Sequence, residues 1–176
     1  MTAAERHQAI EGVLERHHTA TAYVVSQART LLLWHDRLRM WLPPGGHCEP
    51  NEDPVQGAER EAFEESGVDV DVIPPPDLIQ CSGPKVLPPP AVILVEDIVR
   101  PDQPFHQHID HVYFTLAQQR VDFDAPIPHG AHRWVARDEL LQQFSLPEPG
   151  GTLVDVAEDV RLLGVRALDA AAALEA

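Results

Sequence analysis

The acidic residues between Arg60 and Gly67 are the strongest chemical signal in the sequence. The segment "REAFEESG" contains Glu61, Glu64 and Glu65, and a helix would bring them to one side because residues three and four apart share a face. Like charges at this spacing repel one another by roughly 0.2–0.5 kcal/mol per pair. We therefore expect a cation among these carboxylates, and hard oxygen ligands favour Mg²⁺ or Mn²⁺. The alternative is the solvated acidic face of a surface helix.

The residues around this segment predict the helix that positions it. Asp53 is a favourable N-cap and Pro54 suits the first helical position, while Gly67 is expected to end the helix after Ser66. The preceding segment, 40–54, is rich in Pro and Gly and predicts a loop. Residues that could pack the helix against a sheet form a narrow apolar stripe on its flank: Val55, Ala58 and Ala62.

The rest of the chain alternates predicted strands and helices. Apolar residues at helical spacing predict an N-terminal helix over 3–16. Alternating or continuous apolar runs predict strands at 19–26, 30–36, 68–73, 91–99 and 110–117. A short helix is predicted at 137–144 and a long Ala- and Leu-rich helix at 152–174. This mixture predicts an α/β sandwich that forms a single domain over 1–176.

Charge and composition exclude several classes of function. The 176 residues carry 28 Asp and Glu against 13 Lys and Arg, for a net charge of −15. Phosphate contacts by Lys and Arg supply most of the affinity for long nucleic acids, so we expect no such partner. No stretch approaches the ~18 apolar residues needed to span a bilayer, and the N-terminus lacks the apolar core of a signal peptide. With only Cys48 and Cys81, the sequence predicts no disulfide framework and a cytoplasmic protein with no membrane contact.

The segment 46–68, "GHCEPNEDPVQGAEREAFEESGV", resembles the signature of the Nudix hydrolase family, GX5EX7REUXEEXGU, in which U is apolar. It agrees at every defined position, including the motif residues Gly46, Glu52 and Gly67. The resemblance implies an α/β/α sandwich with a central mixed β-sheet and a loop–helix motif over 46–68. A run of acids on a helix is usually a solvated surface face, but with the full motif present a metal site is the favoured interpretation.

The resemblance further implies an activity and roles for the motif residues. Members of the family use a divalent metal, here Mg²⁺ or Mn²⁺, to cleave a phosphoanhydride bond in a nucleoside diphosphate linked to another group. Residues matching Glu61 and Glu65 commonly bind metal, and the residue matching Glu64 binds metal or acts on the water. The residue matching Arg60 orients the acids, and the backbone carbonyl of Gly45 is a further expected ligand.

The general base is not determined by the motif, because members of the family use either a helix glutamate or an acid from a distant segment. Glu64 is the first candidate. Glu96, Asp97 and Asp110 are candidates outside the helix. Glu96 and Asp97 interrupt an apolar strand, so one of them could point into the site, although for either residue alone a strand end that emerges into solvent is the simpler interpretation.

A second group of polar residues lies in "HQHIDHVYF". On a strand, His106, His108 and Asp110 would share one face and His111 would take the other. Such a face could contact phosphates or a transition metal, but histidines at this spacing without a cysteine are a weak metal signal, and a polar sheet face is the simpler interpretation. Three tryptophans could stack on a nucleobase, although packing in the core is favoured: Trp34, Trp41 and Trp134.

The sequence does not distinguish between two classes of substrate, an NDP-sugar or ADP-ribose-like compound and a nucleoside triphosphate. Pro84 lies sixteen residues after Val68, as in some ADP-ribose-cleaving members, but the chain has 17 prolines and the longer signature is not visible. A second class of function is a non-catalytic Nudix-fold module that senses a nucleotide. Such modules usually lack one or more helix acids, whereas this chain retains all of them. A small nucleotide or phosphorylated substrate is the expected partner, and a homodimer stays open.

Overall fold

The computed structural model of the protein describes residues 14–174. Most of the predicted N-terminal helix, 3–16, lies outside these residues. For its last three residues the prediction is wrong, because Leu14 and Glu15 are irregular and Arg16 begins the first strand. None of the helices in the described part of the chain has the length and hydropathy needed to cross a membrane.

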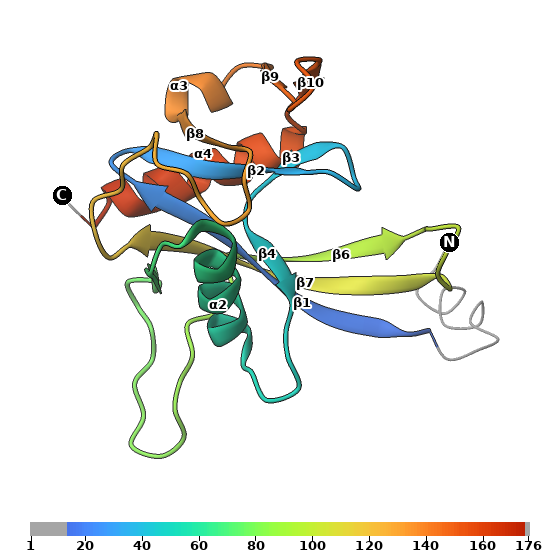
Figure 1. Ribbon diagram of the computed structural model, residues 1–176. Helices are drawn as coiled ribbons and strands as arrows, with labels where there is room; N and C mark the ends of the chain where they lie inside the picture. The colour runs from blue at the N-terminus through green and yellow to red at the C-terminus, as the bar shows by residue number, and fades with distance from the viewer. Residues whose placement is uncertain (1–13, 175–176) are drawn as a thin grey trace.

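The core of the fold is an eight-stranded mixed sheet (Figure 1). Its strands are β1 (Arg16–Ser26), β2 (Arg29–His35), β3 (Met40–Leu42), β4 (Gly45–His47), β5 (Val70–Val72), β6 (Val92–Ile98), β7 (His106–Ala117) and β8 (His132–Ala136). The central pair, β1 and β7, is parallel, and every other pairing in this sheet is antiparallel. The order is β3-β2-β1-β7-β5, with β4 paired to β1, β6 to β7 and β8 to β2.

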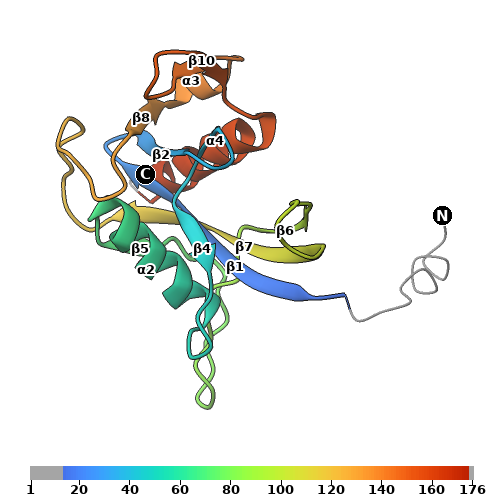
Figure 2. The same cartoon turned by 45° about the vertical axis from the view of Figure 1, so that its right-hand side comes forward.

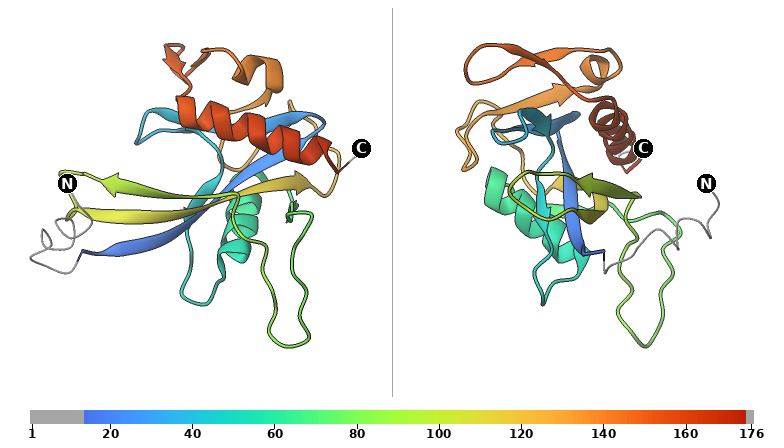
Figure 3. Two further views of the ribbon diagram at one scale, coloured as in Figure 1. Left: turned by 180° about the vertical axis from the view of Figure 1, so that it is seen from behind. Right: turned by 90° about the vertical axis from the view of Figure 1, so that its right-hand side faces the viewer.

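Helices cover both faces of this sheet, as the right-hand view of Figure 3 shows, with α2 (Pro54–Ser66) on one side and α4 (Glu158–Ala172) on the other. A short helix α3 (Arg137–Leu140) and a two-stranded sheet of β9 (Ser145–Pro147) and β10 (Leu153–Asp155) complete the α4 side. Because side chains alternate along a strand, Ala20, Ala22 and Val24 of β1 face α2, whereas Tyr23 and Val25 belong to the α4 core. The predicted α/β/α sandwich with a central mixed sheet is confirmed.

Local sequence explains the bounds of α2. The Asp53 side chain accepts the backbone N–H of Gln56 (3.0 Å), and the Gln56 side chain accepts the backbone N–H of Asp53 (3.0 Å), which forms a capping box. Gly67 ends the helix with a positive φ of 72°, and its N–H donates to Phe63 (2.7 Å). The apolar stripe predicted from the sequence is buried against the sheet: Val55, Ala58 and Ala62.

Several segments differ from the sequence-based prediction. The segment 40–54, predicted as a loop, contributes β3 and β4, and the helix predicted over 152–174 begins only at Glu158 because 153–155 pair with β9 as a strand. The strands β8 and β9 were not predicted, and the helix predicted over 137–144 ends at Leu140. β4 and β8 pair with the distant strands β1 and β2, and such tertiary contacts override weak local preference. β9 and β10 instead pair with each other as a short hairpin.

The tryptophans follow the simpler prediction. Trp34, Trp41 and Trp134 are all buried in the core, so none is exposed to stack on a base. The segment 74–90, which begins and ends with a run of three prolines, has no helix or strand. It forms a long loop that extends away from the sheet (Figures 1 and 2).

Candidate active site

The glutamates of α2 meet the backbone of β4, which the sequence did not predict as a strand. β4 pairs with β1, where a Cβ on Gly45 would lie 2.8 Å from Thr21 Oγ1. A Cβ on the next residue, Gly46, would lie 2.6 Å from Cδ of Glu61. Contacts this short do not occur between real atoms, so Gly45 is required for the close approach of β4 to the backbone of β1, and a side chain at Gly46 would displace the Glu61 carboxylate. The carboxylate of Glu61 occupies the space that a side chain at Gly46 would fill.

Arg60 holds the other motif acids in place. Its Nε and Nη2 bond the two carboxylate oxygens of Glu52 (2.7 and 3.1 Å), while Nη1 bonds Glu61 (2.9 Å) and Glu64 (3.0 Å). Nη2 also donates to the carbonyl of His47 in β4 (2.9 Å). The guanidinium lowers the pKa of the Glu52 carboxyl, and these acids in turn raise the pKa of Arg60. The repulsion expected between the helix glutamates is therefore compensated in part by one cation of the chain itself.

Glu65 is not bound to this arginine and lies on the cavity side of the helix. One of its carboxylate oxygens accepts the N–H of Gly45 (3.1 Å), and the other lies 3.3 Å from Nδ1 of His129. Burial raises the pKa of Glu65, with a contribution from Glu61, and the contacts with Gly45 and His129 oppose this rise. His129 comes from the loop before β8, and no motif in the sequence indicated it.

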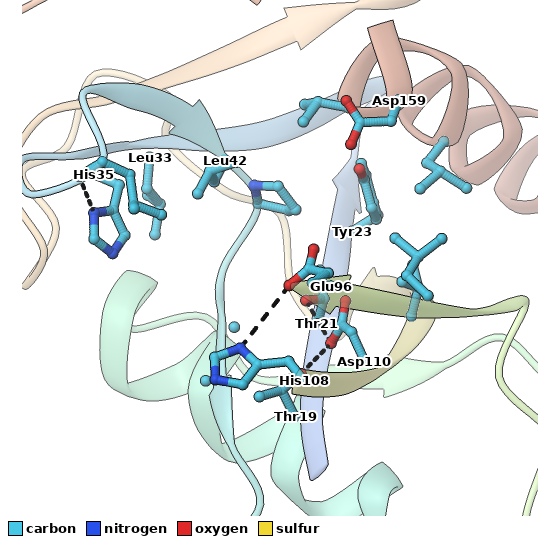
Figure 4. Close-up of a pocket in the computed structure, with 18 of the residues that line it drawn as sticks. Thr19, Thr21, Tyr23, Leu33, His35, Leu42, Glu96, His108, Asp110 and Asp159 are labelled. Atoms are coloured by element: carbon cyan, nitrogen blue, oxygen red, sulfur yellow. Dashed lines mark hydrogen bonds and ion pairs between the residues drawn. The ribbon is translucent and has the colours of Figure 1, made fainter. Parts of the chain in front are cut away.

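A cavity of about 380 Å³ opens beside Glu65, between β4, β6, β7 and α4. Figure 4 shows its polar side, where residues from β1, β6 and β7 converge beneath the start of α4. The polar lining residues are Thr19, Thr21, Tyr23, His35, His47, Glu65, Glu96, Arg100, His108, Asp110, His129 and Asp159. The apolar lining residues include Leu33, Leu42, Val112, Val160 and Leu163. The cavity thus combines acidic and apolar side chains.

Of the three acids predicted outside the helix, two face the cavity and one does not. Asp110 is buried (5% exposed) and accepts the hydroxyls of Thr19 (2.9 Å) and Thr21 (3.1 Å). Burial raises the pKa of Asp110, and burial together with the Asp110 charge raises the pKa of Glu96. Asp97 does not line the cavity, and its carboxylate accepts the side-chain N–H of Gln107 (2.8 Å). Glu96 and Asp110 thus face the cavity, whereas Asp97 does not.

The histidines fall on the two faces that strand alternation predicts. His108 lines the cavity with Asp110, and His106 lies beside His108 at a ring-centroid distance of 5.3 Å. His111 points to the opposite face, where its Nε2 lies 2.9 Å from Nδ1 of His18. The structure adds His17 and His47 to the first group, which pattern alone did not connect with it.

The donor set at α2 fits a hard divalent cation. Both Glu61 and Glu65 bring carboxylate oxygens to β4, Glu61 beside Gly46 and Glu65 at the N–H of Gly45. Oxygen ligands of this kind are those that Mg²⁺ and Mn²⁺ prefer. Glu64 is the most exposed of the three acids, with 57% of its side chain accessible.

Comparisons with known proteins identify the family of the chain. A family model described as "NUDIX domain" matches residues 15–155. The bis(5'-nucleosyl)-tetraphosphatase [asymmetrical] of Rattus norvegicus is 27% identical over 135 residues, which cover 70% of this chain and 74% of that protein. A segment of 29 residues is 55% identical to the m7GpppN-mRNA hydrolase NUDT17 of Bos taurus, and covers 16% of this chain and only 10% of that protein.

A solved structure gives the same result for the fold. The crystal structure of a NUDIX-family hydrolase from Clostridium perfringens superimposes with a TM-score of 0.64 at 28% identity, covering 89% of this chain and 98% of that one. Because the family model spans well over half of the sequence, the chain belongs to the NUDIX family. It is a Nudix hydrolase, a class of enzyme that acts on phosphoanhydrides.

Proposed function

We propose that the chain is a pyrophosphohydrolase, dependent on Mg²⁺ or Mn²⁺, that cleaves a phosphoanhydride bond in a nucleoside diphosphate linked to another group or in a nucleoside triphosphate. The observation that carries this proposal is the placement of the motif acids. Arg60 holds Glu61 and Glu64, and Glu65 lies at the edge of a cavity with a polar and an apolar side. An acidic helix with no functional role would not need an arginine clamp beside such a cavity.

Glu61 and Glu65 would hold the metal, with Glu64 and the carbonyl of Gly45 as further ligands. A bound divalent cation would neutralise the pyrophosphate and lower the pKa of a water molecule. The chain supplies the positioning, since the pairing of Arg60 with Glu52 fixes the guanidinium that orients Glu61. A preorganised arrangement of this kind reduces the reorganisation needed during reaction.

Proton removal from the attacking water requires a carboxylate within reach. Glu64 is our first candidate because it belongs to the same helix and is the most exposed of the three acids. Glu96 and Asp110 are the alternatives, since both face the cavity and burial raises the pKa of each toward the range of a useful base. Asp97 is a poorer candidate because its carboxylate is bonded to Gln107 outside the cavity.

The apolar wall of the cavity suits the nucleoside part of a substrate, with the phosphates directed toward the acids and their metal. A cavity of about 380 Å³ is in the range of small-molecule sites. The rat relative is named for a dinucleoside tetraphosphate, so this class of compound belongs in the substrate panel with NDP-sugars, ADP-ribose and nucleoside triphosphates.

The test is phosphate or nucleotide release from this panel in Mg²⁺, in Mn²⁺ and in excess chelator. We expect turnover that requires metal and rises from acid to mildly alkaline pH, because the base must be deprotonated. Glu61→Gln and Glu65→Gln should abolish turnover, whereas Glu59→Gln, on the same helix but outside the acid cluster, should not. Turnover that resists chelator would contradict the proposal. Nucleotide binding without turnover of any compound would favour the sensing module.

A further inference from the structure

Four histidines from three strands gather at the margin of the cavity, on the face of the sheet opposite α2. They are His17 of β1, His47 of β4, and His106 and His108 of β7, hereafter the histidine cluster. The parallel pairing of β1 with β7 sets His17 directly opposite His108. One ligand nitrogen from each of His17, His106 and His108 can be chosen so that all three lie within 4.8 Å of one another. Only tertiary structure brings His17 and His47 to the other two histidines.

Hydrogen bonds to groups outside the histidine cluster orient the rings of His17 and His106. Nε2 of His17 is 3.0 Å from the carboxylate of Glu15, and Nδ1 of His106 is 3.0 Å from the carbonyl of Pro104. Each of these nitrogens therefore carries the proton, so the lone pair is on Nδ1 of His17 and on Nε2 of His106. Nε2 of His108 is buried and has no hydrogen-bond partner within residues 14–174. Metal-binding histidines typically show this arrangement, in which the second ring nitrogen bonds a carboxylate or a carbonyl.

His47 supplies a fourth nitrogen at a suitable distance. Its Nε2 lies 3.3 Å from Nδ1 of His17. A tetrahedral ion with metal–nitrogen bonds of 2.0–2.1 Å has ligands about 3.3–3.4 Å apart. Among His17, His106 and His108, one nitrogen from each can be chosen so that all three are at most 4.8 Å apart. Rotation of the His17 ring can shorten its separations from the other two.

We propose that the histidine cluster is a transition-metal site, with His17, His106 and His108 as ligands of Zn²⁺ and His47 as the fourth. Imidazole nitrogen suits Zn²⁺ and similar ions, whereas Mg²⁺ and Mn²⁺ prefer the oxygens at α2. The two sites therefore differ in chemistry and take different ions. Because His47 and His108 also line the cavity, the zinc site adjoins the cavity without sharing the glutamate ligands.

Two carboxylates lie beside the histidine cluster. The carboxylate of Glu15 bonds His17, and that of Glu96 lies 3.9 Å from Nδ1 of His108. The adjoining cavity is also lined by the cationic side chain of Arg100. A cation bound by the histidines would thus have a carboxylate next to two of its ligands.

The test is a titration of the metal-stripped full-length chain with Zn²⁺, and with Co²⁺ as a spectroscopic probe, in saturating Mg²⁺. We expect one Zn²⁺ per chain and an intense visible Co²⁺ spectrum of tetrahedral nitrogen coordination. His17→Ala and His106→Ala should each weaken Zn²⁺ binding more than about tenfold and remove this spectrum. The matched control is His18→Ala, whose ring lies on the opposite face of β1, and it should bind Zn²⁺ as the wild type does.

A Glu61→Gln, Glu65→Gln double variant separates this site from the proposed catalytic one, and it should retain both Zn²⁺ binding and the Co²⁺ spectrum. His106 is buried and His17 is not, so replacement of His106 is the more disruptive to folding. If the thermal melt of His106→Ala shows a folding defect, His17→Ala is the decisive variant. A wild type without the tetrahedral Co²⁺ spectrum would overturn the proposal. Unchanged Zn²⁺ affinity in His17→Ala, or its loss in the double variant, would do so as well.

Discussion

Replacement of Arg60 by alanine tests whether a single guanidinium organises the acids of the site. In the structure this side chain bonds Glu52 through two oxygens, Glu61 and Glu64 through one each, and the carbonyl of His47. Arg60→Ala removes all of these bonds and leaves the carboxylates to repel one another. The variant should therefore lose stability and catalytic positioning together.

The size of the stability loss follows from burial. Only 23% of the Arg60 side chain, 16% of Glu52 and 15% of Glu61 are exposed. Such a cluster lies between exposed ion pairs, worth ~0–1 kcal/mol, and buried pairs, whose breakage costs about 3–5 kcal/mol. We expect the free energy of unfolding to fall by ~2–4 kcal/mol. At this chain length 1 kcal/mol corresponds to about 2–4 °C, so Tm should fall by roughly 4–16 °C.

The assay is thermal unfolding in chelator and in saturating Mg²⁺, combined with steady-state kinetics. The loss in Tm should be smaller in Mg²⁺, because a bound cation compensates Glu61 and Glu64 in place of the arginine. Turnover should fall about 10–100-fold, as for other residues that orient metal ligands, with little change in KM. Arg37→Ala is the matched control, since its ion pair with Asp102 (2.8 Å) is 50% and 63% exposed. It should cost less than about 1 kcal/mol and leave turnover unchanged.

Two outcomes would refute this reasoning. If Arg60→Ala melts within the range of Arg37→Ala and turns over normally, the clamp has no energetic role. If KM rises and kcat does not fall, Arg60 contacts the substrate instead of positioning acids. Arg60→Lys distinguishes charge from geometry, because lysine keeps the charge but cannot form the bidentate pair with Glu52.

Gly46→Ala should lower both Tm and kcat, because the added Cβ would lie 2.6 Å from Cδ of Glu61 and displace its carboxylate; wild-type kinetics would show that this packing is not needed. A hundredfold excess of Mg²⁺ or Mn²⁺ over its Kd should raise the wild-type Tm by roughly 5–11 °C, and Glu65→Gln should lose most of that response in the same melts; an undiminished response would place the ion elsewhere. Asp110→Asn should stabilise the chain at neutral pH but not near pH 4. Burial raises the pKa of Asp110 in the folded state. The buried charge therefore lowers the stability only above the pKa of Asp in the unfolded chain, which is near 4. Chemical unfolding of both proteins in chelator across this pH range measures the difference, and a gain that persists in acid would contradict the buried-charge explanation.

The sequence alone determined the features that depend on near neighbours. The capping residues Asp53 and Gly67 predict the bounds of α2, and the i, i+3 and i, i+4 spacing predicts that Glu61, Glu64 and Glu65 share a side of it. Strand alternation likewise separates Asp110 from His111. These features follow from backbone geometry over a few residues, which is the same in every fold.

Only the tertiary structure decided which distant groups meet. Local pattern did not indicate that β4 is a strand, because its glycines become favourable only where β1 and Glu61 approach closely. It could not connect His129 with Glu65, because the loop before β8 brings them together. Nor could it connect His17 with His108, which lie opposite each other through the pairing of β1 with β7. Contacts between segments far apart in the chain depend on how all the elements pack, and this information is not contained in the periodicity of any one of them.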